Sequence, residues 1–219
     1  MGDHVVVIST GVSSNEAAPA ARGAGADRRI RRTRTAIRNA LLELCVEREF
    51  SALTVEDVLE RADIARATFY AHYRSKEDVL VDLAHELASD RADRIAQHEA
   101  KHPEGFTGDP VRIVFEHAQA HRDVYLVILQ GAGDGRALRE FFDQTSRQAE
   151  TLFRARSEHA GVEPRVPLPL VARAWAGEVI GTLVWWLSED TGLPADEVAA
   201  LLSDLSVRGR RWASGSSED

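Results

Sequence analysis

Apolar residues recur every three to four positions along most of this chain, which is the spacing that one face of an α-helix requires. Residues 28–49 form the first such segment, with Ile37, Leu41 and Leu44 on one face. No stretch alternates apolar and polar residues in the way of a half-buried β-strand. The pattern therefore predicts an all-α fold.

Glycine and proline residues mark the breaks between the helical segments. We expect a break between Pro103 and Gly108, a loop at residues 131–135, and another boundary from Pro164 to Pro167. The helices expected after the first are residues 54–62, 65–73, 76–98, 110–120, 122–130, 134–160, 167–190 and 194–212.

Residues 54–73, TVEDVLERADIARATFYAHY, have the pattern of two short helices joined by a tight turn. Thr54 is a candidate N-cap because Asp57 follows three residues later, as in a capping box. Asp63 suits the turn, since Asp is one of the few non-glycine residues that accept a left-handed conformation. Ile64 is expected to fill the space where the two helices cross.

The second of these helices carries polar side chains where a buried helix would carry aliphatic ones. We expect Phe69 to point inward, with Ala65 beside it. The side chains of Arg66, Thr68 and Tyr70 are expected to face outward. This arrangement is typical of a helix-turn-helix that inserts its second helix into the major groove of DNA.

Residues 67–77, ATFYAHYRSKE, resemble the second helix of the DNA-binding domain of TetR-family transcriptional regulators, together with the start of the helix that follows. The similarity extends over residues 29–84. Two positions depart from the family's pattern: Asp63 stands where glycine is usual, and Ala65 stands where a serine or threonine usually caps the helix. The resemblance implies an N-terminal DNA-binding domain, and a C-terminal helical domain that binds an effector and a second copy of the chain.

The chain is accordingly expected to have four parts. Residues 1–26 are rich in Ala, Gly and Ser and lack periodicity, so we expect a mobile extension. Residues 27–84 are the expected DNA-binding domain, and residues 85–213 the effector-binding and dimerisation domain. Residues 214–219 are expected to be a disordered tail, and the helix at 76–98 would link the two domains.

The DNA-binding domain offers two kinds of contact. Residues at the start of its second helix would approach base edges, whereas residues further along, helped by a basic arm, would hold phosphates. The base-edge candidates are Arg66, Ala67 and Thr68; the phosphate candidates are Tyr70, Tyr73 and Lys76; and the assisting candidates are Arg28, Arg29, Arg31, Arg32, Thr54 and Ala65.

The net charge of −8 is unusual for a DNA-binding protein until it is divided along the chain. Residues 22–80 contain 12 basic and 10 acidic residues, whereas the remainder contains 15 and 25, so the two parts carry +2 and −10. The stretch from position 22 to position 38 contains seven arginines and a single acidic residue, Asp27. Such a cluster is either a solvated helix start or an arm that binds phosphates beside the helix-turn-helix. An acidic second half would repel the duplex and help to orient docking.

Residues 171–187, VARAWAGEVIGTLVWWL, are apolar on almost every side, so a helix of this sequence must be buried on more than one face. Gly177 and Gly181 would let another helix approach closely. With the last helix, this segment predicts either a four-helix dimer interface or the core of the monomer. The interface candidates are Ala176, Ile180, Leu183, Val184, Leu187, Val198, Leu201, Leu202 and Leu205.

The resemblance implies an effector cavity in the second domain. Aromatic side chains are common in ligand pockets and equally common in cores. The pocket candidates, each of which could instead belong to the core, are Phe115, Tyr125, Phe141, Phe142, Phe153 and Trp175.

Residues 98–102 match H-E-x-x-H, the pattern of zinc proteases. Pro103 should end the helix at once and no third ligand motif follows, so we expect no enzyme, no cofactor and no metal. His117 and His121 form a second pair one turn apart. An alternative hypothesis is therefore a metal sensor that uses His98, His102, His117 and His121, or a small-molecule carrier without a role in DNA regulation.

The remaining features agree with a cytoplasmic protein. No apolar run approaches the roughly 20 residues needed to cross a membrane, and the start of the chain lacks the basic region of a secretion signal. A single cysteine, Cys45, excludes an internal disulfide framework. The sequence thus predicts a homodimeric repressor that binds a palindromic double-stranded DNA operator and is released by an unidentified small-molecule effector.

Overall fold

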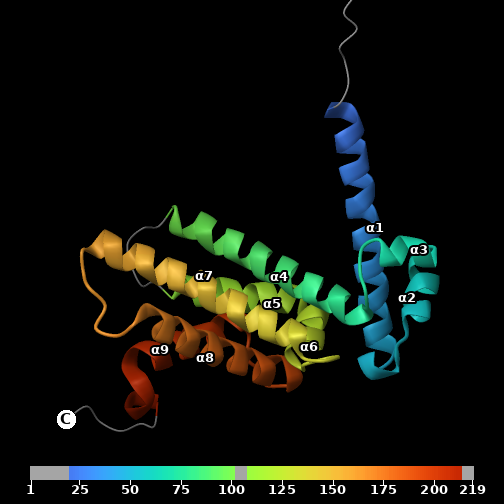
Figure 1. Cartoon of the computed structure of the whole chain (residues 1–219). Helices are drawn as coiled ribbons and strands as arrows, with labels where there is room; N and C mark the ends of the chain where they lie inside the picture. Colours follow the sequence, from blue (N-terminus) through green and yellow to red (C-terminus); the bar gives the residue numbers. More distant parts are fainter. Residues whose placement is uncertain (1–19, 102–107, 214–219) are drawn as a thin grey trace, which may run out of the picture. The chain divides into compact units, whose positions relative to one another are not determined.

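The computed structural model describes the backbone of residues 20–101 and 108–213, and the side chains of residues 27–101 and 108–209. These segments are helical and contain no strand, which confirms the predicted all-α fold (Figure 1). The predicted helices 76–98, 110–120, 122–130 and 134–160 lie within two residues of those observed at both ends.

The first helix, α1 (Ala20–Glu47), begins earlier than the sequence suggested. Residues 20–26, expected to belong to a mobile extension, are helical in their backbone. Four of these seven residues are alanine, the best helix former, and extending an existing helix is far easier than nucleating one. The rest of the expected extension, and the expected tail at 214–219, lie outside the described residues. The chain separates into two units after Thr35, so the start of α1 forms one unit and the chain from Ala36 onward forms the other.

A short 3₁₀ helix, η1 (Phe50–Ala52), leads into α2 (Val55–Ala62) and α3 (Arg66–Tyr70). The predicted capping box is present: the Thr54 hydroxyl accepts from the Asp57 backbone N–H at 3.2 Å, and the Asp57 carboxylate accepts from the Thr54 backbone N–H at 2.7 Å. Asp63 ends α2 in the left-handed conformation, with φ 51° and ψ 51°. Both local predictions are confirmed: the capping box starts α2, and the left-handed Asp63 ends it before α3.

The long helix α4 (Lys76–Glu99) joins the two halves of the second unit. Ser75 caps it, because its hydroxyl accepts from the Asp78 backbone N–H at 3.3 Å. Leu80, Leu83 and Leu87 are buried on its inner face. They belong to one hydrophobic cluster that is continuous from α1 to α9, so the helix-turn-helix and the second domain share a core.

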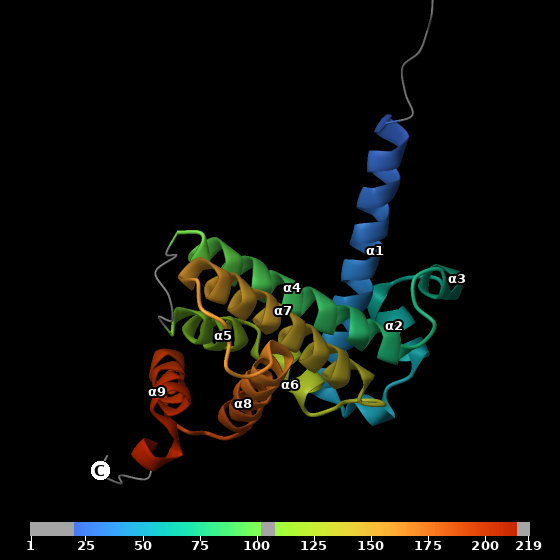
Figure 2. The ribbon, with the colours of Figure 1, turned by 60° about the vertical axis from the view of Figure 1, so that its left-hand side comes forward.

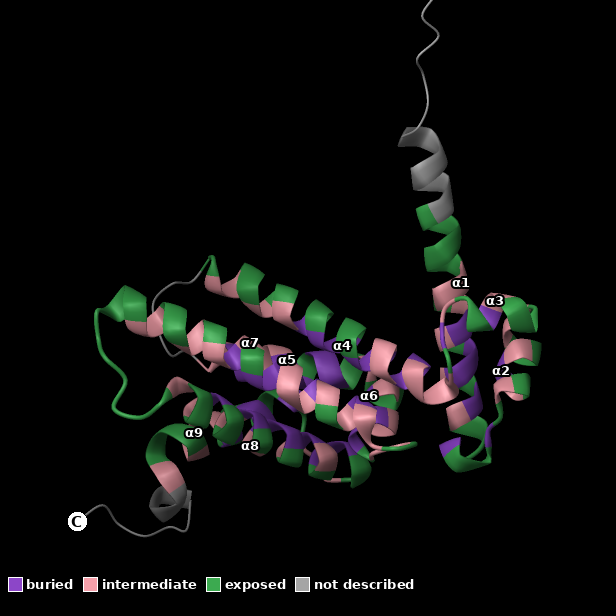
Figure 3. Ribbon diagram, viewed as in Figure 1, coloured by how far each residue is buried: buried purple, intermediate pink, exposed green. Residues whose placement is uncertain are grey.

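The second domain consists of α5 (Asp109–Ala120), α6 (Arg122–Leu129), α7 (Arg136–Ala160), α8 (Leu168–Ser188) and α9 (Ala195–Ala213). Helix α7 lies beside α4 on one side and α8 on the other, while α9 packs on α5 (Figures 1 and 2). The buried residues face one another across these contacts (Figure 3). The last helix is interrupted at Gly209, where φ is 78°.

Helix α8 is long and apolar enough to cross a membrane by length and composition alone, which the sequence analysis did not anticipate. In the structure its residues Ala176, Val179 and Leu183 are completely buried, and the helix packs on α7 and α6. Its buried apolar residues are therefore part of the core of the second domain, while others on the same helix are exposed.

The loop between α6 and α7 contacts the helix-turn-helix. Gly133 has φ 74°, and a Cβ built on it would lie 2.9 Å from Cε1 of Phe50, so only glycine fits there without displacement. Arg136, the first residue of α7, pairs with Asp78 in the first turn of α4 at 2.9 Å. These two contacts connect the second domain to the base of the DNA-binding domain.

Candidate DNA-binding surface and effector groove

The short helix α3 is held by one buried aromatic side chain. Phe69 is completely buried, and its ring meets those of Tyr70 at 5.4 Å and Tyr73 at 5.9 Å between centroids. Five residues are too few to form a stable helix alone. Tertiary packing through Phe69 therefore decides where the rest of α3 points.

The outward face of α3 is the one predicted from the sequence, with one exception. Arg66, Ala67 and Tyr70 are exposed and Thr68 is half-buried. Ala65 was expected to point inward beside Phe69, but it is exposed. It is the N-cap residue and its backbone is extended (φ −71°, ψ 147°). The sequence prediction treated it as a helical residue, so the direction expected for its side chain was wrong. Having no hydroxyl, it caps nothing.

Arg66 is not free in this structure. Its guanidinium donates to the Glu56 carboxylate of α2, and both side chains are more than half exposed. Exposed pairs of this kind contribute little stability because water screens them. The guanidinium can therefore exchange Glu56 for a base edge or a phosphate at small cost.

Tyr73 was predicted to hold a phosphate, and the structure assigns it a different role. The residue is 5% exposed, and its hydroxyl donates to Asp82 of α4 at 2.5 Å. The sequence placed it by the period of a helix up to residue 73. The helix instead ends at Tyr70, and the turn that follows directs Tyr73 into the core.

Lys76 likewise has partners within the chain in place of a phosphate. Its Nζ donates to the carbonyl oxygens of Phe50 at 2.7 Å and Leu53 at 2.5 Å. It also lies over the Phe50 ring, 4.4 Å from the centroid. The ammonium therefore satisfies carbonyls at the end of η1, and its role is to brace the fold. The sequence alone gave no sign of these long-range acceptors.

The other expected contacts are accessible. Thr54 is exposed, although its hydroxyl also donates to the Asp57 carboxylate at 2.7 Å. These hydrogen bonds from Thr54, together with one from Arg48, lower the pKa of Asp57 to about 2. Arg28, Arg29, Arg31 and Arg32 are exposed on α1.

A groove of about 400 Å³ lies between α4 and α7, and Trp175 of α8 forms part of its wall. This volume is within the range of small-molecule sites. Ile95, Leu152 and Ala149 are among the apolar side chains that line it, and Arg91 is the buried charged residue in its wall. Sequence analysis missed Arg91. A signal was present, because it follows Leu80, Ala84 and Leu87 at helical spacing on the apolar face of α4.

The six aromatic candidates for the pocket divide into two groups. Phe115, Tyr125 and Phe141 are completely buried and pack edge-on against neighbouring rings, so they are core residues and not part of the groove. Phe142 is half-buried beside Arg173 and lines neither groove described here. Trp175 lines the α4–α7 groove, and with Phe153 it also lines a second hollow of about 800 Å³ between α8 and α9.

Most of the candidate interface residues lie in the chain's own core. The buried members are Ala176, Ile180, Leu183, Leu187, Val198 and Leu202. Val184 and Leu205 are half-buried, and Leu201 is 48% exposed. For the buried six, the monomer-core alternative is the correct one. The sequence could not decide this, because α8 is apolar on all sides.

The opposite side of α8 remains uncovered. Its exposed residues at helical spacing are Leu170, Ala174, Gly177, Gly181 and Trp185. Leu170 is 61% and Trp185 42% exposed, and no atom lies within 4 Å of a Cβ built on Gly181. We call these five residues the α8 stripe.

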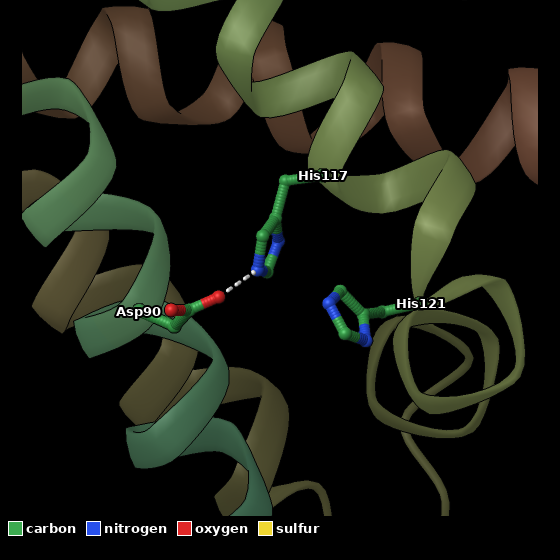
Figure 4. A group of neighbouring side chains, drawn as sticks. All are labelled: Asp90, His117 and His121. Atoms are coloured by element: carbon green, nitrogen blue, oxygen red, sulfur yellow. Dashed lines mark hydrogen bonds and ion pairs between the residues drawn. The ribbon is translucent and has the colours of Figure 1, made fainter. Parts of the chain in front are cut away.

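The histidines are arranged differently from the alternative hypothesis. His102 lies outside the described residues, and His98 Nε2 lies 3.6 Å from Asp109. His117 and His121 instead approach Asp90 of α4 (Figure 4), with potential ligand atoms of all three within 4.8 Å of one another. His117 Nε2 is 2.9 Å from the Asp90 carboxylate and Nδ1 is 2.9 Å from the Tyr125 hydroxyl. Burial lowers the pKa of His117 to about 4, so its ring is neutral near pH 7.

Comparison with known proteins agrees with this geometry. A family model described as "Bacterial regulatory proteins, tetR family" matches residues 37–83. Another, described as "Transcriptional regulator C-terminal region", matches residues 109–207. Together they span the helix-turn-helix and nearly all of the second domain. The chain belongs to the TetR family of bacterial transcriptional regulators.

Individual relatives are more distant. The "Uncharacterized HTH-type transcriptional regulator YxbF" of Bacillus subtilis (strain 168) is 34% identical over 70 residues, which are 32% of this chain and 18% of YxbF. The chain thus spans about a fifth of that relative. A putative TetR-family regulator from Syntrophomonas wolfei has a similar structure, with a TM-score of 0.70, 18% identity, and coverage of 80% of this chain and 95% of that one. FadR from Bacillus subtilis in complex with stearoyl-CoA gives a TM-score of 0.66 and 16% identity, covering 80% and 98%. These structural similarities show the fold.

Proposed function

We propose that this protein is a cytoplasmic, homodimeric repressor that is released from a palindromic operator by a small-molecule effector. The observation that carries the proposal is the outward face of α3, where Arg66, Ala67 and Tyr70 are exposed on a helix braced by Phe69. A short polar helix held in this way suits the major groove.

In the proposed complex, Arg66 leaves Glu56 and binds a base edge, with Ala67 and Thr68 beside it. Tyr70, Thr54 and the arginines of α1 contact phosphates. A guanidinium can bind a guanine through two hydrogen bonds, whereas a phosphate contact has no sequence information. Tyr73 and Lys76 have no part in this interface, because their polar atoms already serve the fold.

The test is an electrophoretic shift and a footprint with the DNA that flanks this protein's gene. Arg66→Ala should weaken operator binding by about 1–3 kcal/mol and relax specificity at one base pair. Arg147→Ala removes an exposed arginine of α7 and serves as the matched control, which should bind like the wild type. Equal affinity of wild type and Arg66→Ala for the footprinted operator would reject the assignment.

The α8 stripe is the proposed dimer interface. Its glycines allow close approach of two helices, and Leu170 and Trp185 supply apolar area that water otherwise covers. A two-fold pair would place two recognition helices on the half-sites of a palindrome.

Gly181→Glu tests this interface without disturbing the monomer, because nothing lies within 4 Å of a Cβ at that position. Light scattering should show a dimer for the wild type and a monomer for Gly181→Glu. Ser89→Glu, which adds the same charge at an exposed position of α4, should remain dimeric. A dimeric Gly181→Glu would place the interface elsewhere.

The α4–α7 groove is the proposed effector site. The solved FadR structure from Bacillus subtilis contains stearoyl-CoA. The groove of this chain is lined mostly by apolar side chains. A ligand between α4 and α7 would change their separation. The motion would reach the helix-turn-helix through the Arg136–Asp78 pair and the contact of Gly133 with Phe50. The effector must bind one arrangement more tightly than the other, or it shifts nothing. An operator affinity that is unchanged by a ligand bound in the groove would reject this route.

A second candidate function is regulation by a divalent cation at Asp90, His117 and His121. Two histidines one turn apart and a carboxylate are a ligand set that zinc and similar ions accept, with a position left open for water. Tyr125 would hold the other nitrogen of His117, as outer partners of metal-bound histidines commonly do. This candidate replaces the set that included His98 and His102.

Cobalt titration followed by visible absorption tests the second candidate. One equivalent should bind to the wild type, His121→Ala should lose it, and His98→Ala should retain it. Equal cobalt binding by wild type and His121→Ala would reject the site. If cobalt bound while no duplex DNA did, the protein would be a metal carrier instead of a regulator.

A further inference from the structure

Arg91 carries a positive charge into the interior of the second domain. Its residue exposure is 2%, and its guanidinium lies over the Phe141 ring, 4.9 Å from the centroid. Nη2 donates to the Thr145 hydroxyl at 2.8 Å and to Gln148 Oε1 at 3.3 Å. Nη1 is buried and has no hydrogen-bond partner.

No carboxylate of the described residues forms an ion pair with Arg91. The neighbouring Asp90 carboxylate is bonded to His117 and Arg94. Glu99, the acidic residue in the groove wall, is bonded to Arg156 at 2.8 Å. Burial raises the pKa of Tyr125, an effect larger than the lowering by the charge of Arg91 and by its hydrogen bond with Arg91, so Tyr125 remains a neutral hydroxyl that supplies no negative charge. Among the described residues, none compensates the charge of Arg91 in the groove wall.

A guanidinium does not lose its proton under any ordinary condition, so burial cannot be relieved by neutralisation. Burying such a charge without a counter-ion is strongly unfavourable. An oxyanion bound to Nη1 would supply both the missing acceptor and the missing charge. Arginine binds carboxylates and phosphates well because its planar fork matches two oxygens.

The rest of the groove specifies the body of the ligand. From Arg91 it follows α4 past Ile95 to Glu99, a distance of roughly 12 Å at the helical rise per residue. Leu152 and Trp175 form the facing wall. The Glu99 end is already neutralised by Arg156, so a ligand with a single charge would direct it towards Arg91.

We propose that the effector is an apolar molecule with one acidic group, an amphiphilic carboxylate or phosphate, whose oxyanion binds Arg91 and whose apolar body fills the groove beside Ile95, Leu152 and Trp175. This inference rests on the proposed effector role of the groove and adds the chemical class of its ligand.

The test compares four probes that share one twelve-carbon chain: laurate, dodecyl phosphate, 1-dodecanol and dodecylammonium. Calorimetry and thermal shift are measured on the full chain, below the micelle concentration of each probe. At least one anionic probe should bind about tenfold to a hundredfold more tightly than dodecanol, the range expected for a hydrogen bond to a charged group. Dodecylammonium should not bind. The two anions distinguish a carboxylate ligand from a phosphate ligand.

Variants then assign the preference to one residue. Arg91→Gln should bind laurate and dodecanol equally, whereas Arg91→Lys should retain part of the preference for the anion. Arg94→Gln removes an exposed arginine one turn along the same helix, whose partner is Asp90, and should behave like the wild type. If Arg91→Gln does not fold, the four probes on the wild type and the Arg91→Lys variant still decide.

The inference is overturned if dodecanol binds the wild type as tightly as both anions, if none of the four probes binds, or if Arg91→Gln keeps the preference. These measurements contain no DNA, so their failure leaves the proposed repressor role in place. If instead the protein bound laurate through Arg91 but bound no duplex DNA, the ligand class would stand and the proposed repressor role would fail.

Discussion

The recognition helix and the α4–α7 groove each depend on an arginine, and the two arginines are in opposite environments. Arg66 is exposed on α3 and paired with Glu56 in water. Arg91 is buried, with a neutral hydroxyl, an amide and an aromatic ring around it. Water screens the first charge, so its partner can be exchanged easily. The second charge is buried and has no ion pair among the described residues, and we propose that a ligand supplies the counter-ion.

The two regions also differ in how far the sequence alone can locate a binding site. The residues proposed to face DNA lie within the single short helix α3 (Arg66–Tyr70), and their direction follows from one buried neighbour, Phe69. The groove combines residues of three helices that are distant along the chain. The following predictions test how far the two regions differ, and the largest expected effect comes first.

Phe69→Ala should destabilise the protein by about 3–5 kcal/mol, because it removes a completely buried ring and leaves a cavity. Operator binding should disappear with it, since α3 has no other anchor. Tyr70→Ala is the control on the next residue, which is 49% exposed. It should change the free energy of unfolding by less than about 0.5 kcal/mol, while it weakens DNA binding. Chemical denaturation measures both, and wild-type stability of Phe69→Ala would contradict the bracing role.

Lys76→Met should destabilise the protein by about 2 kcal/mol, because the carbonyls of Phe50 and Leu53 lose a charged donor. If Lys76 held a phosphate instead, the main effect would be a flatter salt dependence of DNA binding. We expect that salt dependence to be unchanged at temperatures where the variant is folded. Lys101→Met, at an exposed position beyond α4, should alter neither quantity.

Gly133→Ala and Gly135→Ala form a matched pair at the contact between the two regions. Both glycines have positive φ, 74° and 72°, so both substitutions strain the backbone. Only the Cβ at position 133 meets another group, the Phe50 ring at 2.9 Å. Gly133→Ala should therefore be less stable than Gly135→Ala by about 1 kcal/mol or more. It should also weaken operator binding, and equal behaviour of the two variants in both assays would mean that the loop does not couple the regions.

Glu56→Gln should raise operator affinity by about twofold to fivefold, which matches the small contribution of an exposed ion pair. The change releases Arg66 and removes a negative charge beside the proposed DNA surface. Glu60→Gln makes the same change at an exposed position of the same helix and controls for the net charge. Fluorescence anisotropy with labelled operator measures the affinity of both variants. An equal gain in Glu56→Gln and Glu60→Gln would mean that the change in net charge alone raises the affinity.

Local sequence rules predicted the elements that local interactions create. Thr54 with Asp57 and the left-handed Asp63 act within three residues, so their roles could be inferred before the structure was known. The same rules failed where a residue's partner is distant. Tyr73 reaches Asp82, and Lys76 reaches the carbonyls of η1. Neither pairing leaves a pattern in the sequence.

The second domain shows this limit more strongly. Periodicity predicted its helices to within a few residues, but α8 is apolar on all sides and cannot reveal which side is covered. Only the packing of α7 and α6 against it buried Ile180 and Leu183 and left Gly181 and Trp185 uncovered.

From neighbouring residues alone, helix period and capping gave the helical class, most helix boundaries and the outward face of α3, but not the start of α1 or the end of α3. The packing of the helices decided which apolar faces are buried, which polar groups are bonded within the chain, and that Arg91 lies beside a groove with no counter-ion among the described residues. Burial and charge compensation depend on contacts between helices far apart along the chain, and no rule of spacing contains them.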